Sequence, residues 1–311
     1  MQFNDFLLNE PAIEAAIDFN PVTVPPETLL VNVIALMNQK RTYSCSLFPP
    51  VDATMHETEA SCVLVMQETE LLGIFTERDI VRLTAQGVPF NQVSIGEVMT
   101  KPVITLSQAA FKDIFAPLFL FRRYRIRHLP ILGKENELIG LVTHESIRSI
   151  LRPIHLLKFM RVGDVMSTQV IRTPMTASVL SLAQVMAEYR ISCVVITEQH
   201  PQLDLGHFVH VPIGIVTERD IVQFQALQLN LAEIQAKDVM STPLFLLNPE
   251  DSLLTALIEM QRRHTRRLVV SWQGGKELGI VTQSSLLRVL DPVQMYGVIE
   301  TLQQTVTTHN F

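Results

Sequence analysis

The feature that most constrains this chain of 311 residues is an internal repeat that occurs four times. The first marker is a glycine, two apolar residues and a threonine, and it begins at Gly73, Gly140, Gly214 and Gly279. The second marker is an acidic residue, a valine, a methionine and a serine or threonine, with its methionine at Met99, Met166 and Met240. The glycines are 67, 74 and 65 residues apart, and the methionines keep the first two of these intervals. Two markers that recur at the same intervals indicate a repeated structural unit.

The four repeats alternate in kind. The odd repeats, one and three, carry Thr-Glu-Arg-Asp, and 8 of 11 positions are identical between residues 73–83 and 214–224. The even repeats, two and four, have Ser146 and Ser285 in place of that aspartate. The odd-to-odd spacing is 141 residues and the even-to-even spacing is 139. This alternation predicts that a pair of repeats was duplicated, which gives two modules of similar size.

Periodicities within one repeat predict the element order β-α-β-β-α. The first repeat is expected to contain an extended run at 22–24, a helix over 27–41, strands at 62–66 and 71–75, and a second helix carrying Ile80, Val81 and Leu83. A unit of about 60 residues is marginal alone, so two units are expected to pack sheet to sheet. The segments 42–59 and 197–212 are polar or contain proline, and we expect surface loops there.

Composition and charge exclude several classes of protein. An apolar content of 47% excludes an intrinsically disordered chain, and a net charge of −6 argues against a nucleic-acid binder. The longest apolar run, 114–121, is far shorter than the ~18 residues of a membrane helix, so no membrane contact is expected. The N-terminus does not look like a signal peptide, and we expect a cytoplasmic protein. Cys45, Cys62 and Cys193 form no C-x-x-C, which argues against a disulfide framework or zinc ribbon; the last two are expected in the core.

The repeats resemble CBS domains, the family named after cystathionine β-synthase. The resemblance lies in the Val-Met-[Ser/Thr] start, the strand pair, and the glycine-to-aspartate motif that opens the last helix. It implies an α/β fold of four CBS repeats in two pseudo-twofold Bateman modules, which face each other within one chain or between two. It also implies regulation by adenosyl ligands bound between paired repeats, without catalysis. The expected units are 17–93, 94–160, 161–235 and 236–291, followed by a helical connector at 292–311.

The odd-repeat motif is expected to bind ribose. Helix N-termini favour anions, and a carboxylate such as Asp79 or Asp220 can accept hydrogen bonds from a ribose diol. The glycine that opens each motif would let the backbone approach a ligand. Thr-x-x-Asp is also close to a capping box, which explains the pattern without any ligand. Ser146 and Ser285 cannot replace a bidentate carboxylate, so we expect at most one good site per module. The expected threonines of these turns are Thr76, Thr143, Thr217 and Thr282.

Basic residues concentrate at matching places in the even repeats. The expected phosphate contacts are Arg127, His128, Arg266 and Arg267, since these residues enter the second strand beside the site that the resemblance implies. Arg78 and Arg219 adjoin the odd motif and could face phosphate or solvent. The remaining cations, Arg122, Arg123, Arg262 and Arg263, also fit a solvated helix end. The cluster His200, Asp204, His207 and His210 fits a polar loop better than a metal site.

These observations favour an adenine-nucleotide sensor that binds AMP, ADP or ATP and works as a homodimer. The ligand is regulatory, and no cofactor is expected. A weaker resemblance to the sensory part of cyanobacterial signalling proteins implies a kinase or cyclase output domain as partner. The main alternative is a ligand-free interaction scaffold. An enzyme is not expected, because no nucleophile stands beside a recognisable base. Nucleic-acid binding through the arginine clusters is a further, less favoured alternative.

Overall fold

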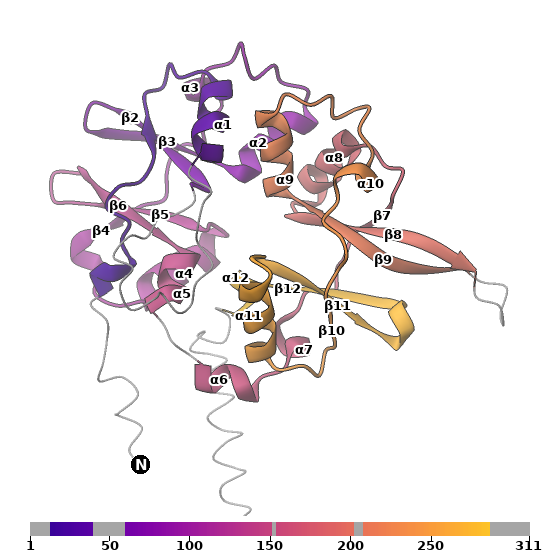
Figure 1. Cartoon of the computed structure of the whole chain (residues 1–311). Helices are drawn as coiled ribbons and strands as arrows, with labels where there is room; N and C mark the ends of the chain where they lie inside the picture. The colour runs from indigo at the N-terminus through magenta and orange to yellow at the C-terminus, as the bar shows by residue number, and fades with distance from the viewer. Residues whose placement is uncertain (1–12, 40–59, 151–153, 202–207, 287–311) are drawn as a thin grey trace, which may run out of the picture.

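The computed structural model describes residues 13–39, 60–150, 154–201 and 208–286. In these residues each repeat contains one three-stranded sheet and two helices, in the predicted order β-α-β-β-α (Figure 1). The first strand of every sheet runs parallel to the second, and the second pairs antiparallel with the third. The sequence prediction of the fold class is therefore confirmed.

The elements of the odd and even repeats correspond one to one. Repeat 1 contains β1 (Thr23–Val24), α1 (Leu30–Gln39), β2 (Cys62–Gln67), β3 (Glu70–Thr76) and α2 (Glu77–Ala85). Repeat 2 contains β4 (Leu106–Ser107), α4 (Phe115–Tyr124), β5 (His128–Leu132), β6 (Leu138–Thr143) and α5 (His144–Ile150). Repeat 3 contains β7 (Arg172–Pro174), α8 (Val179–Tyr189), β8 (Cys193–Pro201), β9 (Phe208–Thr217) and α9 (Glu218–Ala226). Repeat 4 contains β10 (Leu246–Leu247), α11 (Leu253–Arg262), β11 (Arg267–Trp272), β12 (Glu277–Thr282) and α12 (Gln283–Leu286).

Short helices precede, connect or interrupt these units. They are η2 (Ile13–Ala16), α3 (Ile95–Val98), η3 (Gln108–Ala110), α6 (Ile154–Phe159), α7 (Val162–Val165), α10 (Ala236–Val239) and η4 (Gln273–Gly275). The acidic residue of the second sequence marker lies in α3, α7 or α10 and accepts a backbone N–H at the start of that helix. Glu97 accepts from Ser94 at 2.9 Å, and the same bonds hold its pKa below the usual range. The marker thus has a capping role.

The strands are apolar on both faces because each sheet lies between two cores. Along β2, Val63 and Val65 pack with the helices of their own repeat, whereas Cys62 and Leu64 pack against repeat 2. Leu141 of β6 contributes the facing side chain in that second cluster. A strand buried on both faces reads as a continuous apolar run rather than an alternating one. Cys62 and Cys193 are buried in the two inter-sheet clusters, as predicted.

Repeats 1 and 2 form one module and repeats 3 and 4 the other, as the alternation of the sequence predicts. Within each module, the segment that opens one repeat pairs with a strand of the other: Thr100 bridges to Ile74, and Asp18 bridges to Leu141. The second module repeats this exchange with Ser241 on Ile215 and Ser167 on Ile280. Both modules therefore have the reciprocal contacts of a pseudo-twofold pair.

The two modules pack against each other within one chain, through the helices of the odd repeats (Figure 1). Val222 of α9 is fully buried in the helix cluster of repeat 1, and Val81 of α2 is buried in that of repeat 3. Gln225 of α9 donates a hydrogen bond to Thr84 of α2 at 3.0 Å. This arrangement decides between the two alternatives left open by the sequence, since the facing surfaces belong to the same chain.

The interpretation of residues 197–212 as a surface loop is wrong for most of the segment. β8 continues to Pro201 and β9 begins at Phe208, with paired positions from Thr197–Pro212 out to Pro201–Phe208. The paired strands extend beyond the sheet of repeat 3 as a two-stranded arm (Figure 1). Alternating β-formers at 208–213 stabilise this extension despite the prolines. Residues 42–59, Cys45 and the connector at 292–311 lie outside the described residues.

Candidate functional site

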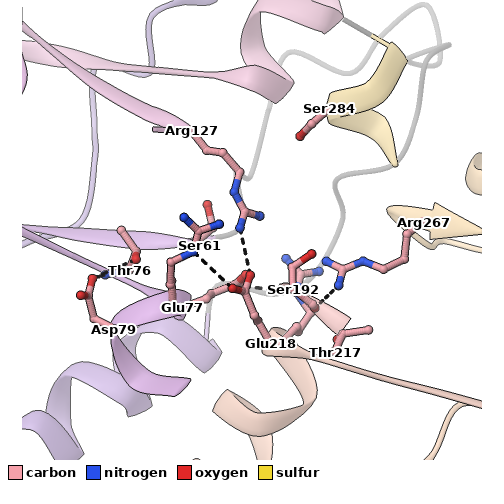
Figure 2. Close-up of polar contacts among 12 residues, drawn as sticks. Ser61, Thr76, Glu77, Asp79, Arg127, Ser192, Thr217, Glu218, Arg267 and Ser284 are labelled. Atoms are coloured by element: carbon pink, nitrogen blue, oxygen red, sulfur yellow. Dashed lines mark hydrogen bonds and ion pairs between the residues drawn. The ribbon is translucent and has the colours of Figure 1, made fainter. Parts of the chain in front are cut away.

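Each strand-to-helix turn is closed by the side chains three residues apart that the sequence singled out. In the odd repeats, Asp79 accepts hydrogen bonds from the backbone and hydroxyl of Thr76 at 3.0 and 2.9 Å, and Asp220 accepts both from Thr217 at 2.8 Å. The turn is therefore the capping box that the sequence also suggested. Asp79 and Thr76 are drawn together in Figure 2.

The even repeats build the same turn with two hydroxyls. The Thr143 N–H donates to Ser146 at 2.9 Å, and the Ser146 N–H donates back to Thr143 at 3.0 Å. Thr282 and Ser285 make the equivalent bonds at 3.2 and 3.1 Å. The hydroxyl pair keeps the backbone conformation but carries no negative charge. The aspartates of the odd repeats are thus not needed for the turn itself.

Asp79 lies at the junction of repeats 1 and 2. Its second carboxylate oxygen accepts hydrogen bonds from Arg82 at 3.2 Å and from Thr100 at 3.4 Å. Thr100 belongs to the segment that opens repeat 2, and its backbone pairs with Ile74 at the end of β3. Asp79 is only 9% exposed. In the other module, Ser241 pairs with Ile215 in the same way, so Asp220 occupies the matching position.

The glycine that opens each odd motif has a packing role that the sequence did not predict. A Cβ at Gly73 would collide with the side chain of Met99, and one at Gly214 would collide with Met240. A methionine of the next repeat therefore makes a close approach to the backbone at each of these glycines.

The residues expected to contact phosphate bridge different repeats. Arg127 donates to Glu218 of repeat 3 at 3.0 Å, and Arg266 lies 3.7 Å from Glu145 of repeat 2 (Figure 2 shows the first pair). Arg267 donates to the backbone carbonyl of Ser192 within its own module. Each of these cations therefore has an oxygen partner from another repeat.

His128 is held as a neutral imidazole. Its Nε2 lies 2.6 Å from the Ser61 hydroxyl, across the interface of repeats 1 and 2. Burial, followed by the positive charge of Arg127, lowers the pKa of His128 to about 3. His144, 3.1 Å from Ser284 of repeat 4, has its pKa lowered to about 4 by burial and by Arg127. Neither imidazole brings positive charge to a phosphate at neutral pH.

Two carboxylates that the sequence reasoning missed connect the odd repeats. Glu218 is 1% exposed and lies 3.5 Å from Arg78 of repeat 1, while Glu77, 7% exposed, lies 3.5 Å from Arg219 of repeat 3. The pairs are reciprocal, as expected when the same Thr-Glu-Arg-Asp segment faces its duplicate. In the sequence, the Glu-Arg pair that occurs in both odd repeats was the signal that could have predicted these contacts.

The ion pairs and hydrogen bonds that cross between the two modules at this place involve nine of the described residues. We call them the polar network: Glu77, Arg78, Arg127, His144, Glu145, Glu218, Arg219, Arg266 and Ser284.

The other candidate residues lie apart from this network. Arg122, Arg123, Arg262 and Arg263 are exposed at the C-terminal ends of α4 and α11, which confirms a solvated helix end. Arg263 additionally pairs with Glu259 at 3.0 Å and lies 4.2 Å over the ring of Phe245. Among the described residues, no cluster of His, Cys, Asp and Glu could bind a metal ion. Asp204 and His207 are not among them.

The fold and these turns define a CBS-domain protein. The family model for the CBS domain matches residues 15–85, 95–153, 162–226 and 236–292, and the chain belongs to this family. In the part of the chain that the structure describes, no helix is long and apolar enough to cross a membrane.

Similarity to solved structures supports the four-repeat arrangement. Protein MJ1225 from Methanocaldococcus jannaschii, described as a suggested archaeal homologue of γ-AMPK, matches with a TM-score of 0.67 at 18% identity, over 90% of this chain and 99% of that one. An uncharacterised conserved protein from Pyrococcus horikoshii matches with a TM-score of 0.53 at 14% identity, over 89% of this chain and 98% of that one. At these identities the likeness concerns the fold.

Curated relatives match over part of their length. An uncharacterised protein from Methanopyrus kandleri is 33% identical over 41% of this chain, and inosine-5′-monophosphate dehydrogenase from Aquifex aeolicus is 30% identical over 43%. The chain spans 61% of the first relative and 23% of the second. The match to the dehydrogenase is therefore a match to a minor part of that enzyme.

Proposed function

We propose that the chain is a regulatory module that senses adenine nucleotides, with one ribose-binding carboxylate per module. The observation that carries this proposal is the position of Asp79 and Asp220. Each carboxylate stands at the start of a helix, beside the segment that opens the next repeat, although hydroxyls suffice for the same turn in the even repeats. A carboxylate that the turn does not need, present in both modules, can accept the hydrogen bonds of a ribose diol.

The cations of the even repeats complete the proposed site. The side chains of Arg127 and Arg266 are 34% and 24% exposed, so an incoming phosphate can reach both guanidinium groups. Arg267 is the first residue of β11 and follows Arg266 directly, so it belongs to the same cationic group. His128, the first residue of β5, follows Arg127 but is neutral, so it adds a hydrogen-bonding group and no charge. Charge-assisted hydrogen bonds to phosphate contribute about 1.5–3 kcal/mol each. The resemblance to CBS repeats, and the name of the M. jannaschii relative, favour an adenosine ligand.

The test is to replace the aspartate of each odd repeat with the serine found at that position in the even repeats. In the variants Asp79→Ser and Asp220→Ser the turn keeps a capping side chain but loses its charge. Calorimetry with AMP, ADP and ATP should show that each variant loses one class of site or binds at least about tenfold more weakly, which is about 1.4 kcal/mol. The free energy of unfolding should fall by less than about 1 kcal/mol.

The matched control is Ser285→Ala, which removes a cap of the same turn without touching a carboxylate. It should cost about 1 kcal/mol of stability and leave nucleotide binding unchanged. Wild-type affinity in both aspartate variants would reject the ribose role. Absence of binding by the wild-type chain to any nucleotide would favour the interaction scaffold instead.

Assembly and output belong to the same proposal. We propose a homodimer that passes the nucleotide signal to a kinase or cyclase output domain or partner. Because the odd-repeat helices already join the two modules, a dimer would have to use other surfaces. Light scattering of the purified chain, with and without ATP, measures the mass directly; a monomer under both conditions would contradict the dimer.

A further inference from the structure

Two of the three arginines proposed to bind phosphate, Arg127 and Arg266, are paired with a carboxylate of the opposite module. Arg127 of repeat 2 contacts Glu218 of repeat 3 at 3.0 Å, and Arg266 of repeat 4 lies 3.7 Å from Glu145 of repeat 2. We infer that Glu218 and Glu145 occupy the place of a phosphate on these arginines, so that a nucleotide must displace them to bind. This inference rests on the proposed function and deepens it, because it names the residues that set nucleotide affinity.

The chemistry of the two partners makes them competitors. Carboxylate and phosphate are both oxyanions that bind the fork of a guanidinium, often through two parallel hydrogen bonds. A phosphate that reached Arg127 while Glu218 stayed in place would bring two negative charges close together in a partly dehydrated site, where repulsion is strong. The guanidinium group of the arginine therefore binds either the carboxylate or the phosphate, but not both at once.

The exchange is feasible because neither carboxylate would be left without support. The Glu218 side chain is only 2% exposed, and an isolated buried charge would be costly, but Arg78 lies 3.5 Å from its other oxygen. The Glu145 side chain is 30% exposed, so water can solvate it when Arg266 turns away. Arg127 is the more exposed partner of its pair, with 34% of its side chain exposed. The side chain of Arg266 is 24% exposed, so a phosphate can reach it as well.

The exchange also links nucleotide binding to the contact between modules. Both ion pairs cross from one module to the other, so a phosphate that takes the arginine removes a bond between the modules. Whatever weakens that bond should strengthen phosphate binding, because coupling between two equilibria is reciprocal. The two carboxylates thereby lower the affinity of the site for nucleotides.

Charge-removing variants of the full chain test this directly. Glu218→Gln and Glu145→Gln keep the side-chain shape, and calorimetry compares ATP with adenosine, which carries no phosphate. We expect each variant to bind ATP about tenfold more tightly, equivalent to about 1.4 kcal/mol, with adenosine affinity unchanged. The control Glu259→Gln removes a carboxylate that pairs with Arg262 and Arg263 at the exposed end of α11, and should change neither affinity.

The outcomes separate this inference from the proposed function. Equal tightening of ATP and adenosine would show a general loosening of the site and overturn the competition. Unchanged ATP affinity in both variants, with ATP binding by the wild-type chain intact, would overturn this inference alone. Failure of the wild-type chain to bind ATP would overturn the proposed function and this inference with it. If Glu218→Gln fails to fold in a thermal unfolding assay, Glu145→Gln, at a partly exposed position, decides the matter.

Discussion

The odd and even repeats have the same backbone elements but contribute different sets of charged residues to the polar network. The odd repeats contribute two buried carboxylates, Glu77 and Glu218, each with an arginine beside it in the motif, whereas the even repeats contribute Arg127, Arg266 and a single carboxylate, Glu145. At the turn itself, threonine with aspartate in one type and threonine with serine in the other give equivalent caps. The turn therefore accepts either a carboxylate or a hydroxyl as its cap. The charged residues next to the turn can therefore differ between odd and even repeats without changing the backbone.

The largest difference between the two types is expected at the helix contact that joins the modules. Val222 of α9 is fully buried among the helices of repeat 1, whereas repeat 2 has Arg148 at the corresponding place in the sequence. Val222→Arg should lower the free energy of unfolding by about 3 kcal/mol or more, because it forces an unpaired charge into an apolar contact. Chemical denaturation measures the loss.

The control for that variant is an arginine on the same helix at an exposed position. Leu227, the C-cap residue of α9, is 59% exposed, so Leu227→Arg should change stability by less than about 0.5 kcal/mol. Equal stability of the two variants would show that the odd-repeat helices do not hold the modules together.

A second difference concerns pH. The position of His128 in repeat 2 is held in the odd repeats by Cys62 and Cys193, whose pKa values are raised by burial, so both thiols stay neutral through the acidic range. The folded pKa values of His128, about 3, and His144, about 4, lie below the unfolded value near 6.5. Below that value the unfolded chain binds more protons than the folded one, so stability falls as the pH falls.

Between pH 6.5 and 5.5 each histidine should remove about 1 kcal/mol of unfolding free energy per pH unit, giving about 2 kcal/mol for the pair. The variant His128→Cys, which copies repeat 1, should reduce this slope by about half even if it lowers stability at every pH. Denaturation curves across this range measure both quantities. A slope that the variant leaves unchanged would mean that the imidazole of His128 is not protected from protonation.

Much of this arrangement could be predicted from the sequence because the relevant signals are local. The β-α-β-β-α order follows from periodicity within about 60 residues, and the pairing of repeats follows from their alternation. The polar network was less accessible, since its members lie far apart in the chain: 91 residues separate Arg127 from Glu218, and 142 separate Arg219 from Glu77. The prolines at 201 and 212 suggested a loop, whereas the β-formers between Phe208 and Ile213 decided the structure.

The smallest expected effect concerns a turn that odd and even repeats share. Arg190 ends α8 with φ of 53°, and His264 follows α11 with φ of 50°, in each case just before the second strand of the repeat. The left-handed conformation costs a non-glycine residue about 1–2 kcal/mol, and the extra freedom of glycine in the unfolded chain offsets part of any gain. Arg190→Gly and His264→Gly should therefore each raise the free energy of unfolding by about 0.5 kcal/mol.

Arg263 provides the control for these glycine variants, because its φ of −99° lies outside the left-handed region. Arg263→Gly should destabilise the chain by about 0.5–1 kcal/mol, since glycine then gains no backbone relief and loses the contact with Phe245. Equal gains at Arg190 and His264 in denaturation curves would mean that this turn is set by the backbone alone, whatever chemistry its repeat carries. A gain confined to one type of repeat would show that the odd and even repeats already differ in the backbone that leads into the polar network.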